Sequence, residues 1–337
     1  MKNTLFYTIA HEVMGKAFQD RLPEFTPDET SEDINLIRQE LASLTLTDAS
    51  SALYDGDMAD DYISNVTGDG TMSAFYRFHA ARISQVIQGC SHVVDLCCGP
   101  AEQLSLVAEL NPDIHFTGID LSPAMAQEAQ KRIRALGLKN VTIKVGNIKN
   151  LKSVLRLERD KDQNEFEVIE DGSVEGVIST MALHHLYTEK DLAQAMTEIS
   201  RVMKPQAAMY IVDFSRMKFK SSVDYFADLS APHQTKEFND EYRNSMHAAF
   251  RYTTLAEFTA QYLPEHVKIH TTRPVPMLSI IKSADKVLPL AKLRKIRDMT
   301  KDIKPEYMKQ VNDARMCLRF GGLKNDPLTL ARSLKES

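Results

Sequence analysis

Residues 92–122 contain the feature that most constrains how this chain can fold. An apolar strand at 93–96 is followed by a tight turn at 97–100, an amphipathic helix, and a second apolar strand at 114–119 that ends on Asp120. Strand, helix and strand within about thirty residues form a βαβ unit, in which the strands are parallel and the crossover is right-handed. The carboxyl ends of parallel strands lie at one edge of the sheet, where such folds bind ligands. The sequence therefore predicts a ligand site between the turn and Asp120.

Three later segments continue this pattern along the chain. They read Val-Gly-Asn-Ile at 145–148, Val-Ile-Ser-Thr-Met-Ala-Leu-His-His-Leu at 177–186 and Ile-Ser-Arg-Val-Met-Lys-Pro at 199–205. Together with Asp-Leu-Cys-Cys-Gly-Pro-Ala at 95–101, their order resembles that of class I S-adenosylmethionine-dependent methyltransferases. The resemblance is nearest to the small-molecule and ubiquinone/menaquinone C-methyltransferase group, and it covers roughly residues 54–283.

The resemblance implies an α/β fold with a doubly wound, seven-stranded, mostly parallel sheet of Rossmann-like type. We expect a core domain at 73–284, a helical cap and cofactor-covering lead-in at 1–72, and a helical extension at 285–337. The segment 215–250 is rich in aromatic and polar residues and follows the fifth expected strand, so we expect a lid over the carboxyl edge. The charged stretch 153–173 is expected as a surface excursion or a short hairpin.

Two amphipathic helices are predicted after the core. Their apolar stripes need a covering surface, which is either this subunit or a second copy of the chain. The stripe residues expected to be buried are Leu290, Leu293, Ile296, Tyr307, Val311 and Leu318.

The same resemblance implies S-adenosyl-L-methionine as the cofactor. The turn would approach its methionine half, and the helix that follows would favour its carboxylate. Asp120 would accept the ribose hydroxyls, Asn147 would bind the adenine amino group, and Leu121 and Ile148 would pack on the ring. The full set of expected cofactor residues is Tyr62, Asp95, Cys97, Gly99, Asp120, Leu121, Asn147, Ile148 and Thr180.

The turn departs from the usual family pattern, because Cys97 and Ala101 stand where glycines are common. We interpret the vicinal Cys97 and Cys98 as packing beneath the cofactor rather than as redox or nucleophilic groups. A nicotinamide-binding domain shares the layout, but its turn normally reads Gly-x-Gly-x-x-Gly, and only Gly99 of that pattern is present here.

Three residues are candidates for acting on the methyl acceptor. His184 and His185 follow the fourth expected strand and Asp213 ends the fifth, so all three reach the carboxyl edge. Histidine can act as a base near neutral pH. The alternative is that the two histidines only pack where the chain enters the next helix. The candidate substrate residues are Tyr54, Phe75, Tyr225 and His233, with packing against the sheet as the alternative for Phe75.

Composition is that of an ordinary globular protein, with 43% hydrophobic and 26% charged residues. No apolar run approaches the ~20 residues that span a bilayer, and the stretch 5–10 is too short for a signal peptide. The four cysteines lack metal-ligand spacing, which suits a reducing cytoplasm. We therefore expect a cytoplasmic enzyme without a bound metal ion or a membrane span.

The net charge of −5 hides an asymmetry between the ends of the chain. Residues 1–50 carry nine acidic and four basic residues, whereas residues 282–315 carry ten basic and five acidic ones. The two ends could pair within the chain or across a homodimer, the basic segment could meet an anionic partner, or both could be solvated helix faces.

Three functions are compatible with these patterns. The first is a methyltransferase that acts on a small molecule by in-line displacement, without a nucleic-acid partner. The second is an RNA or protein methyltransferase that grips its substrate with the basic segment. The third is a non-catalytic protein that uses the same fold for binding, although the intact Asp95 turn and Asp120 speak against it.

Overall fold

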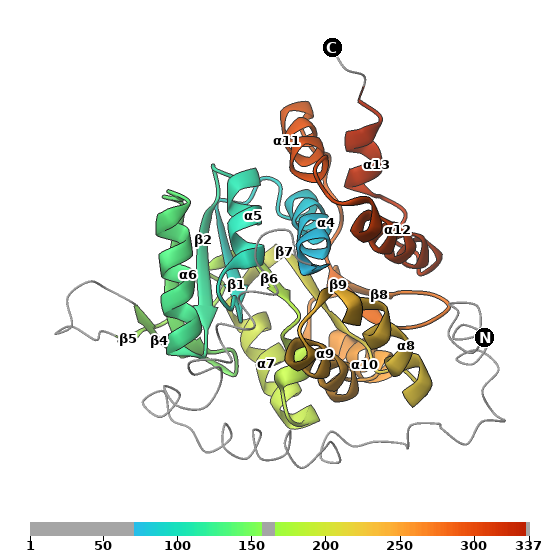
Figure 1. Ribbon diagram of the computed structural model, residues 1–337. Coiled ribbons are helices and arrows are strands. Elements are labelled where there is room, and N and C mark those ends of the chain that lie inside the picture. The colour runs from blue at the N-terminus through green and yellow to red at the C-terminus, as the bar shows by residue number, and fades with distance from the viewer. Residues whose placement is uncertain (1–70, 157–165, 335–337) are drawn as a thin grey trace.

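The computed structural model describes residues 71–156 and 166–334 and is drawn in Figure 1. Two of the candidate site residues, Tyr54 and Tyr62, lie outside the described residues. Within these two ranges, no helix has both the length and the apolar character needed to cross a membrane.

A sheet forms the centre of the described chain, with nine strands in the order β5-β4-β3-β2-β1-β6-β7-β9-β8. Strands β3, β2, β1, β6 and β7 are parallel, and β4, β5, β9 and β8 pair antiparallel with their neighbours. The strands are β1 (His92–Leu96), β2 (His115–Asp120), β3 (Val141–Asn147), β4 (Asn150–Arg156), β5 (Phe166–Glu167), β6 (Val174–Thr180), β7 (Met203–Phe214), β8 (Lys268–Thr271) and β9 (Leu278–Lys282). The chain winds outward from β1 in both directions, so the carboxyl end of β1 is the switch point at which doubly wound folds bind ligands.

Helices cover both faces of this sheet, as Figure 1 shows. Helices α4, α5 and α6 pack on one face, and α7 and α10 pack on the other. Their bounds are α4 (Thr71–Val86), α5 (Glu102–Leu110), α6 (Pro123–Ala135), α7 (Glu189–Val202) and α10 (Tyr252–Tyr262).

The central strands and their helices form where the sequence pattern predicts them. Val93, Val94 and Leu96 of β1 are all fully buried, because a parallel strand with helices on both sides has no solvent-facing side. At the start of α6, the hydroxyl of Ser122 accepts the backbone N–H of Met125 at 3.3 Å, which caps the helix before its first-turn proline.

The α/β fold class is confirmed, but the sheet has nine strands rather than the expected seven. The two additional strands are β4 and β5, which lie in and beside the stretch 153–173 and extend the sheet beyond β3. Gly146 permits this pairing, since a Cβ there would meet Val154 Cγ1 at 2.6 Å. Leu151 and Val154 of β4 are fully buried, which anchors the extension in the core.

Three helices follow the last strand and pack on α4: α11 (Leu290–Thr300), α12 (Pro305–Phe320) and α13 (Pro327–Arg332). Arg77 and Arg82 of α4 donate to backbone carbonyls of this extension, at Met299 and Asn325, both at 3.1 Å. The predicted apolar stripes are buried at Leu293, Ile296, Tyr307, Val311 and Leu318. Leu290 was expected in the same stripe but is 63% exposed, because it is the first residue of α11 and lies beyond the face that contacts α4 and α5.

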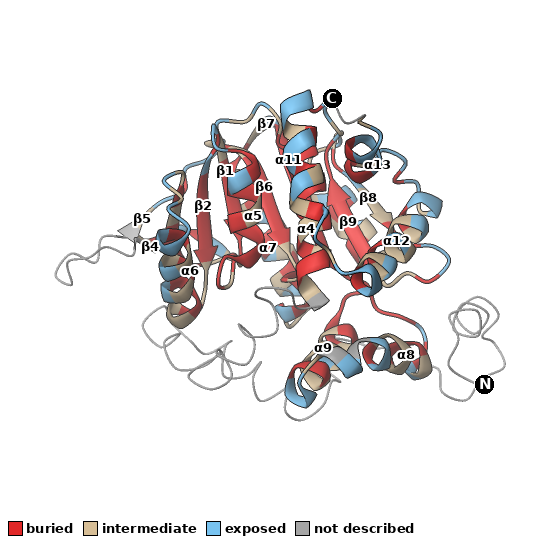
Figure 2. Cartoon of the chain, turned by 45° about the horizontal axis from the view of Figure 1, so that its top comes forward, coloured by how far each residue is buried: buried red, intermediate tan, exposed pale blue. Residues whose placement is uncertain are grey.

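The segment that follows β7 forms α8 (Lys220–Ser230), a short 3₁₀ helix η4 (Ala231–His233) and α9 (Lys236–Ala248). Figure 2 shows α8 and α9 beyond the ends of the strands, with buried residues on the sides that face the sheet. A third apolar cluster, which includes Phe214, Val223 and Met246, joins them to the end of β7. The segment therefore lies over the carboxyl end of β7.

Candidate functional site

A cavity of about 160 Å³, here called the edge cavity, lies at the carboxyl ends of β1, β2, β3 and β6. Eight of the nine expected cofactor residues line it, namely Asp95, Cys97, Gly99, Asp120, Leu121, Asn147, Ile148 and Thr180. The ninth, Tyr62, is outside the described residues. Residues from four different strand ends therefore meet at one site, as the topology predicts.

The turn after β1 shapes the floor of the edge cavity. Cys97, Gly99 and Ala101 all have left-handed backbone conformations, with φ of 57°, 53° and 61°. A left-handed conformation costs a residue with a Cβ roughly 1–2 kcal/mol, which explains why glycines are common at these positions. The backbone N–H of Cys98 donates to Ile119 O at 3.1 Å, and that of Gly99 donates to Asp120 Oδ2 at 2.7 Å. The turn is thus tied directly to the end of β2.

Two carboxyl groups, those of Asp95 and Asp120, line this part of the edge cavity. Asp120 also accepts the backbone N–H of Ser122 at 2.9 Å, and these hydrogen bonds oppose the burial that raises its pKa. Asp95 is 2% exposed, and its burial, with the charge of Asp120 as a second cause, raises its pKa well above the ordinary value. Such a pair favours a ligand that brings hydroxyl or ammonium donors, because these stabilise the charged carboxylates.

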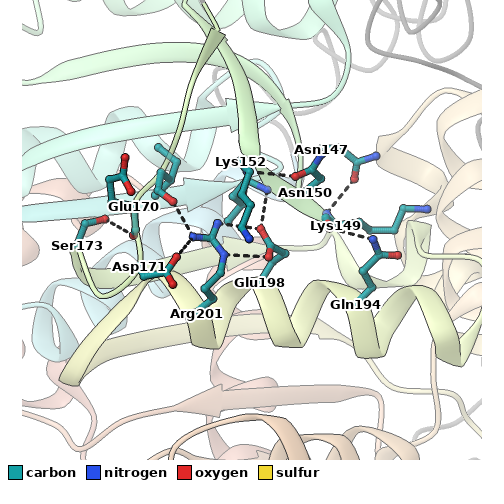
Figure 3. Close-up of polar contacts among 12 residues, drawn as sticks. Asn147, Lys149, Asn150, Lys152, Glu170, Asp171, Ser173, Gln194, Glu198 and Arg201 are labelled. Carbon is teal, nitrogen blue, oxygen red and sulfur yellow. Dashed lines mark hydrogen bonds and ion pairs between the residues drawn. The ribbon is translucent and has the colours of Figure 1, made fainter.

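The loop after β3 forms another side of the edge cavity, and Figure 3 shows how α7 holds it. The N–H of Lys149 donates to Asn147 Oδ1 at 2.9 Å, and Gln194 Nε2 donates to the carbonyl of Lys149 at 3.2 Å. Further along, Glu198 accepts the N–H of Leu151 at 2.9 Å. The side chains of Asn147 and Ile148 are therefore presented by a loop that is fixed at both ends.

A second cavity, here called the histidine cavity, adjoins the first and is lined by residues of α4, η3 (Leu183–His185), β7 and α9. The two cavities share three lining residues, Tyr76, Met181 and His185. His184 lines the histidine cavity alone. The space in front of His184 therefore lies next to the edge cavity.

Asp213 holds His184 in place. Its Oδ1 lies 2.6 Å from His184 Nδ1 and accepts the N–H of Phe214 at 2.6 Å. Its Oδ2 accepts the backbone N–H groups of Ala182 and His184, at 2.9 and 3.2 Å. An ionised carboxylate can only accept, so Nδ1 of His184 carries the proton and Nε2 is left as the basic nitrogen. Both side chains are nearly inaccessible, at 4% and 2% exposed.

His185 differs from His184 in its surroundings. Its ring stacks on that of His184 with the centroids 4.2 Å apart. Its side chain is exposed and borders both cavities. The surrounding protein atoms and then the adjacent His184 lower the pKa of its imidazole.

The remaining candidates are spread more widely than expected. Asp213 lines neither cavity, so it reaches an acceptor only through His184. Phe75 and Tyr225 line two further cavities, described below, rather than the space next to His184. His233 lies in η4, and its side chain is not described; Tyr54 is outside the described residues.

Tyr76, which neighbours Phe75 on α4 and which the sequence also offered as a pocket residue, lines both cavities. The structure adds Met181 and Tyr242, which were not among the predicted site residues. Tyr242 lies within the predicted lid, so its region was indicated by the sequence. Met181 had no such signal, because its position depends on a left-handed turn with φ of 55° directly after β6.

Comparisons with known proteins agree with this arrangement. Residues 88–288 match the profile of a family described as "Methyltransferase domain". The chain is 27% identical over 157 residues to carboxy-S-adenosyl-L-methionine synthase of Campylobacter curvus, covering 42% of this chain and 67% of that protein. It is 25% identical over 142 residues to demethylmenaquinone methyltransferase of Listeria welshimeri, covering 42% of this chain and 52% of that protein. This match thus spans about half the length of the Listeria enzyme.

Among solved structures, the plantazolicin methyltransferase in complex with SAH aligns with a TM-score of 0.49 and 14% identity. The alignment covers 74% of this chain and 100% of that one. A SAM-dependent methyltransferase from Aquifex aeolicus aligns with a TM-score of 0.43 and 14% identity, over 63% of this chain and 92% of that one.

Proposed function

The chain belongs to the methyltransferase-domain family, with S-adenosylmethionine as cofactor, and from this premise we propose that it methylates a small-molecule acceptor held next to His184. The observation that carries the proposal is that the edge cavity and the histidine cavity adjoin at Tyr76, Met181 and His185, which line both. A donor in the first and an acceptor in the second would meet at these residues.

The residues of the edge cavity fit the cofactor. Besides the two carboxylates, Gln103 Oε1 and Thr180 Oγ1 are buried and have no hydrogen-bond partner among the described residues. Both residues line the edge cavity, and a buried polar atom without a partner costs roughly 1–3 kcal/mol. A ligand rich in hydroxyl and amino groups would satisfy them. Asp120 and Asn147 would hold the ribose and adenine, and the turn at 97–101 the methionine half.

When bound, S-adenosylmethionine supplies an electrophilic methyl group that is transferred by in-line displacement. The protein's part is to orient the acceptor, exclude water and remove a proton where the acceptor carries one. His184 suits the last task, since Asp213 fixes the tautomer with Nε2 unprotonated and would stabilise the imidazolium once a proton arrives. Asp213 is accordingly a positioning residue in this proposal.

A small acceptor is favoured over RNA or protein by two features of the structure. Helix α9 of the expected lid lines the histidine cavity, so it encloses one side of the space next to His184. Several bases of the C-terminal extension are also engaged within the chain: Lys292 contacts Gln88 and Asn111, Arg315 pairs with Asp326, and Lys309 pairs with Asp313. These contacts reduce the positive charge available for a phosphate backbone.

Methyl transfer from labelled S-adenosylmethionine to separated cell fractions tests the proposal. We expect label in the small-molecule fraction, at a rate that hardly changes with salt, and loss of that label with His184→Ala. Label in RNA that disappears between low and physiological salt would instead identify a nucleic-acid methyltransferase. Tight binding of S-adenosylhomocysteine without label in any fraction would point to the non-catalytic alternative.

A further inference from the structure

Two more cavities continue the histidine cavity away from the cofactor residues. The inner apolar cavity lies between α4, β9 and α12 and shares Met72, Met181, Phe214 and Tyr242 with the histidine cavity. The outer apolar cavity lies between α8, α12 and the residues before β9. It shares four residues with the inner one, which are Tyr242, Met277, Gln310 and Ala314. Four cavities therefore follow one another from Asp120 to α12.

Apolar side chains predominate along this path. The histidine cavity is lined mostly by aromatic and methionine side chains, together with the polar groups of His184, Glu241 and Ser245. The inner and outer apolar cavities are lined mainly by aromatic, aliphatic and methionine side chains, and Asp313 is the one charged side chain among their described lining residues. The path thus offers hydrogen-bonding groups beside His184 and mainly apolar contacts beyond Phe214.

The two apolar cavities have room for a hydrocarbon group of a ligand. They measure about 100 and 120 Å³. Protein interiors are close-packed, and residual apolar cavities destabilise a fold in proportion to their volume. Engineered apolar cavities of roughly 150 Å³ stay dry and take up benzene-sized ligands.

Helix α12 supplies one wall of both cavities, through Gln310 and Ala314. This helix lies outside residues 88–288, the part of the chain that matches the methyltransferase-domain family. It is fixed to the core, since the N–H of Arg273 donates to Cys317 O at 2.9 Å. Leu229, which lines the outer cavity, is 46% exposed, so the path reaches the surface between α8 and α12.

We propose that the inner and outer apolar cavities form a subsite for a hydrocarbon substituent of the acceptor, whose polar reactive group lies at His184. This inference rests on the proposed function and adds the substrate class: an amphipathic molecule with one polar head and an extended apolar tail. The tail runs from Phe214 towards α12. This helix of the C-terminal extension forms one wall of the subsite, through Gln310 and Ala314.

Binding of 4-alkylphenols to the full-length protein tests the subsite. Titration calorimetry is carried out with saturating S-adenosylhomocysteine, from 4-methylphenol to 4-octylphenol. Each methylene that enters an apolar cavity strengthens binding about fourfold, so we expect the affinity to climb with chain length until the space is filled. In Ala314→Phe, a ring occupies the junction of the two cavities, and we expect 4-octylphenol to bind at least tenfold more weakly than to the wild type.

Two further variants keep this test decisive. Met316→Phe adds an aromatic ring to the same helix at a position that is 47% exposed, and it should bind the whole series like the wild type. Ala314→Leu introduces a smaller obstruction and replaces the phenylalanine variant if that one does not fold. Binding of S-adenosylhomocysteine should be unchanged in all three.

The inference is overturned if wild-type affinity does not depend on chain length, which is the result expected where another part of this chain, such as residues 1–70, fills the cavities. It is equally overturned if both Ala314 variants show the wild-type dependence. These failures leave binding of S-adenosylhomocysteine intact, whereas a wild-type protein that does not bind S-adenosylhomocysteine would reject the proposed function itself.

Discussion

The edge cavity and the histidine cavity share three residues, yet they are assembled in different ways. Every described residue that lines the edge cavity except Tyr76 lies between 95 and 187, at or near the ends of the parallel strands. The histidine cavity draws on α4, η3, β7 and α9, which span residues 72 to 245. The first is a product of sheet topology, and the second is a product of how a lid and a helix pack over that topology.

This difference explains why one site is general and the other is particular. Parallel strands bring their carboxyl ends to one edge whatever the loops contain, so a cofactor site there persists through large changes in sequence. A cavity built from side chains of distant helices changes shape with each of them. Substitutions should therefore separate the two regions, with binding affected in one and turnover in the other.

The largest expected effect falls on the histidine cavity. We expect His184→Ala to lower kcat by 10²- to 10⁴-fold, the usual contribution of a general base, while affinity for S-adenosylhomocysteine stays within twofold. His115→Ala, which alters an exposed histidine at the amino end of β2, serves as the control. A kcat of His184→Ala equal to that of the wild type would show that His184 is packing only.

The next effect belongs to the edge cavity. Asp120→Ala removes the acceptor of the Gly99 and Ser122 N–H groups as well as a ligand contact. We expect S-adenosylhomocysteine affinity to fall by about 1–3 kcal/mol, measured by titration calorimetry. Asp120→Asn retains one oxygen and should lose less. If both variants bind S-adenosylhomocysteine with wild-type affinity, Asp120 does not bind the ribose.

A third prediction concerns the free energy of unfolding, which the buried Asp95 in the edge cavity makes dependent on pH. Because the pKa of Asp95 is raised, the folded state holds its proton more tightly than the unfolded state does. This contribution to stability is present below the unfolded-state pKa and is lost as the pH rises through the raised pKa. Asp95→Asn cannot ionise, so we expect its free energy of unfolding at pH 7 to exceed that of the wild type.

Urea denaturation at several pH values between 4 and 8 measures this effect, and the Asp95→Asn variant should show the flatter dependence on pH. The affinity for S-adenosylhomocysteine should fall in the same variant, because a binding residue that destabilises the fold is retained for its contact with the ligand. A variant that is less stable than the wild type at pH 7 would contradict the interpretation.

The smallest expected effect tests the strained turn. Cys97→Gly places glycine at φ of 57°, where it is favoured, so we expect stabilisation of up to about 1 kcal/mol and a melting temperature higher by about 2–4 °C. Gly118→Ala is the opposite case, since its Cβ would lie 2.8 Å from Leu104 Cδ2, and it should lower the melting temperature. A lower melting temperature for Cys97→Gly would mean that the thiol packs well enough to outweigh the strain.

The sequence predicted the cofactor side of this protein well. The βαβ unit at 92–122 and the ordered motifs indicated the family and the α/β fold, and both are confirmed. They also indicated which residues meet at the carboxyl edge, because each follows directly on a strand whose direction the topology fixes. Binding of the cofactor by the eight candidate residues that line the edge cavity remains a prediction.

What only the tertiary structure decided depends on contacts between segments distant in the chain. The sequence placed both Asp213 and His184 at the carboxyl edge. Their roles differ because the Asp213 carboxylate, 29 residues from the histidine, accepts hydrogen bonds from four N–H groups, one of them on the His184 ring. Tyr225 had the composition of a lid residue, yet it lies against α12 in the outer apolar cavity.

The strand count illustrates the same limit, since β4 joins the sheet through the contact of Val154 with Gly146, which no local periodicity encodes. Local patterns specify the elements and, through parallel-strand topology, the edge at which their ends meet. The packing angles of helices and lid specify which side chains then face one another, and those angles arise only when the whole chain has folded.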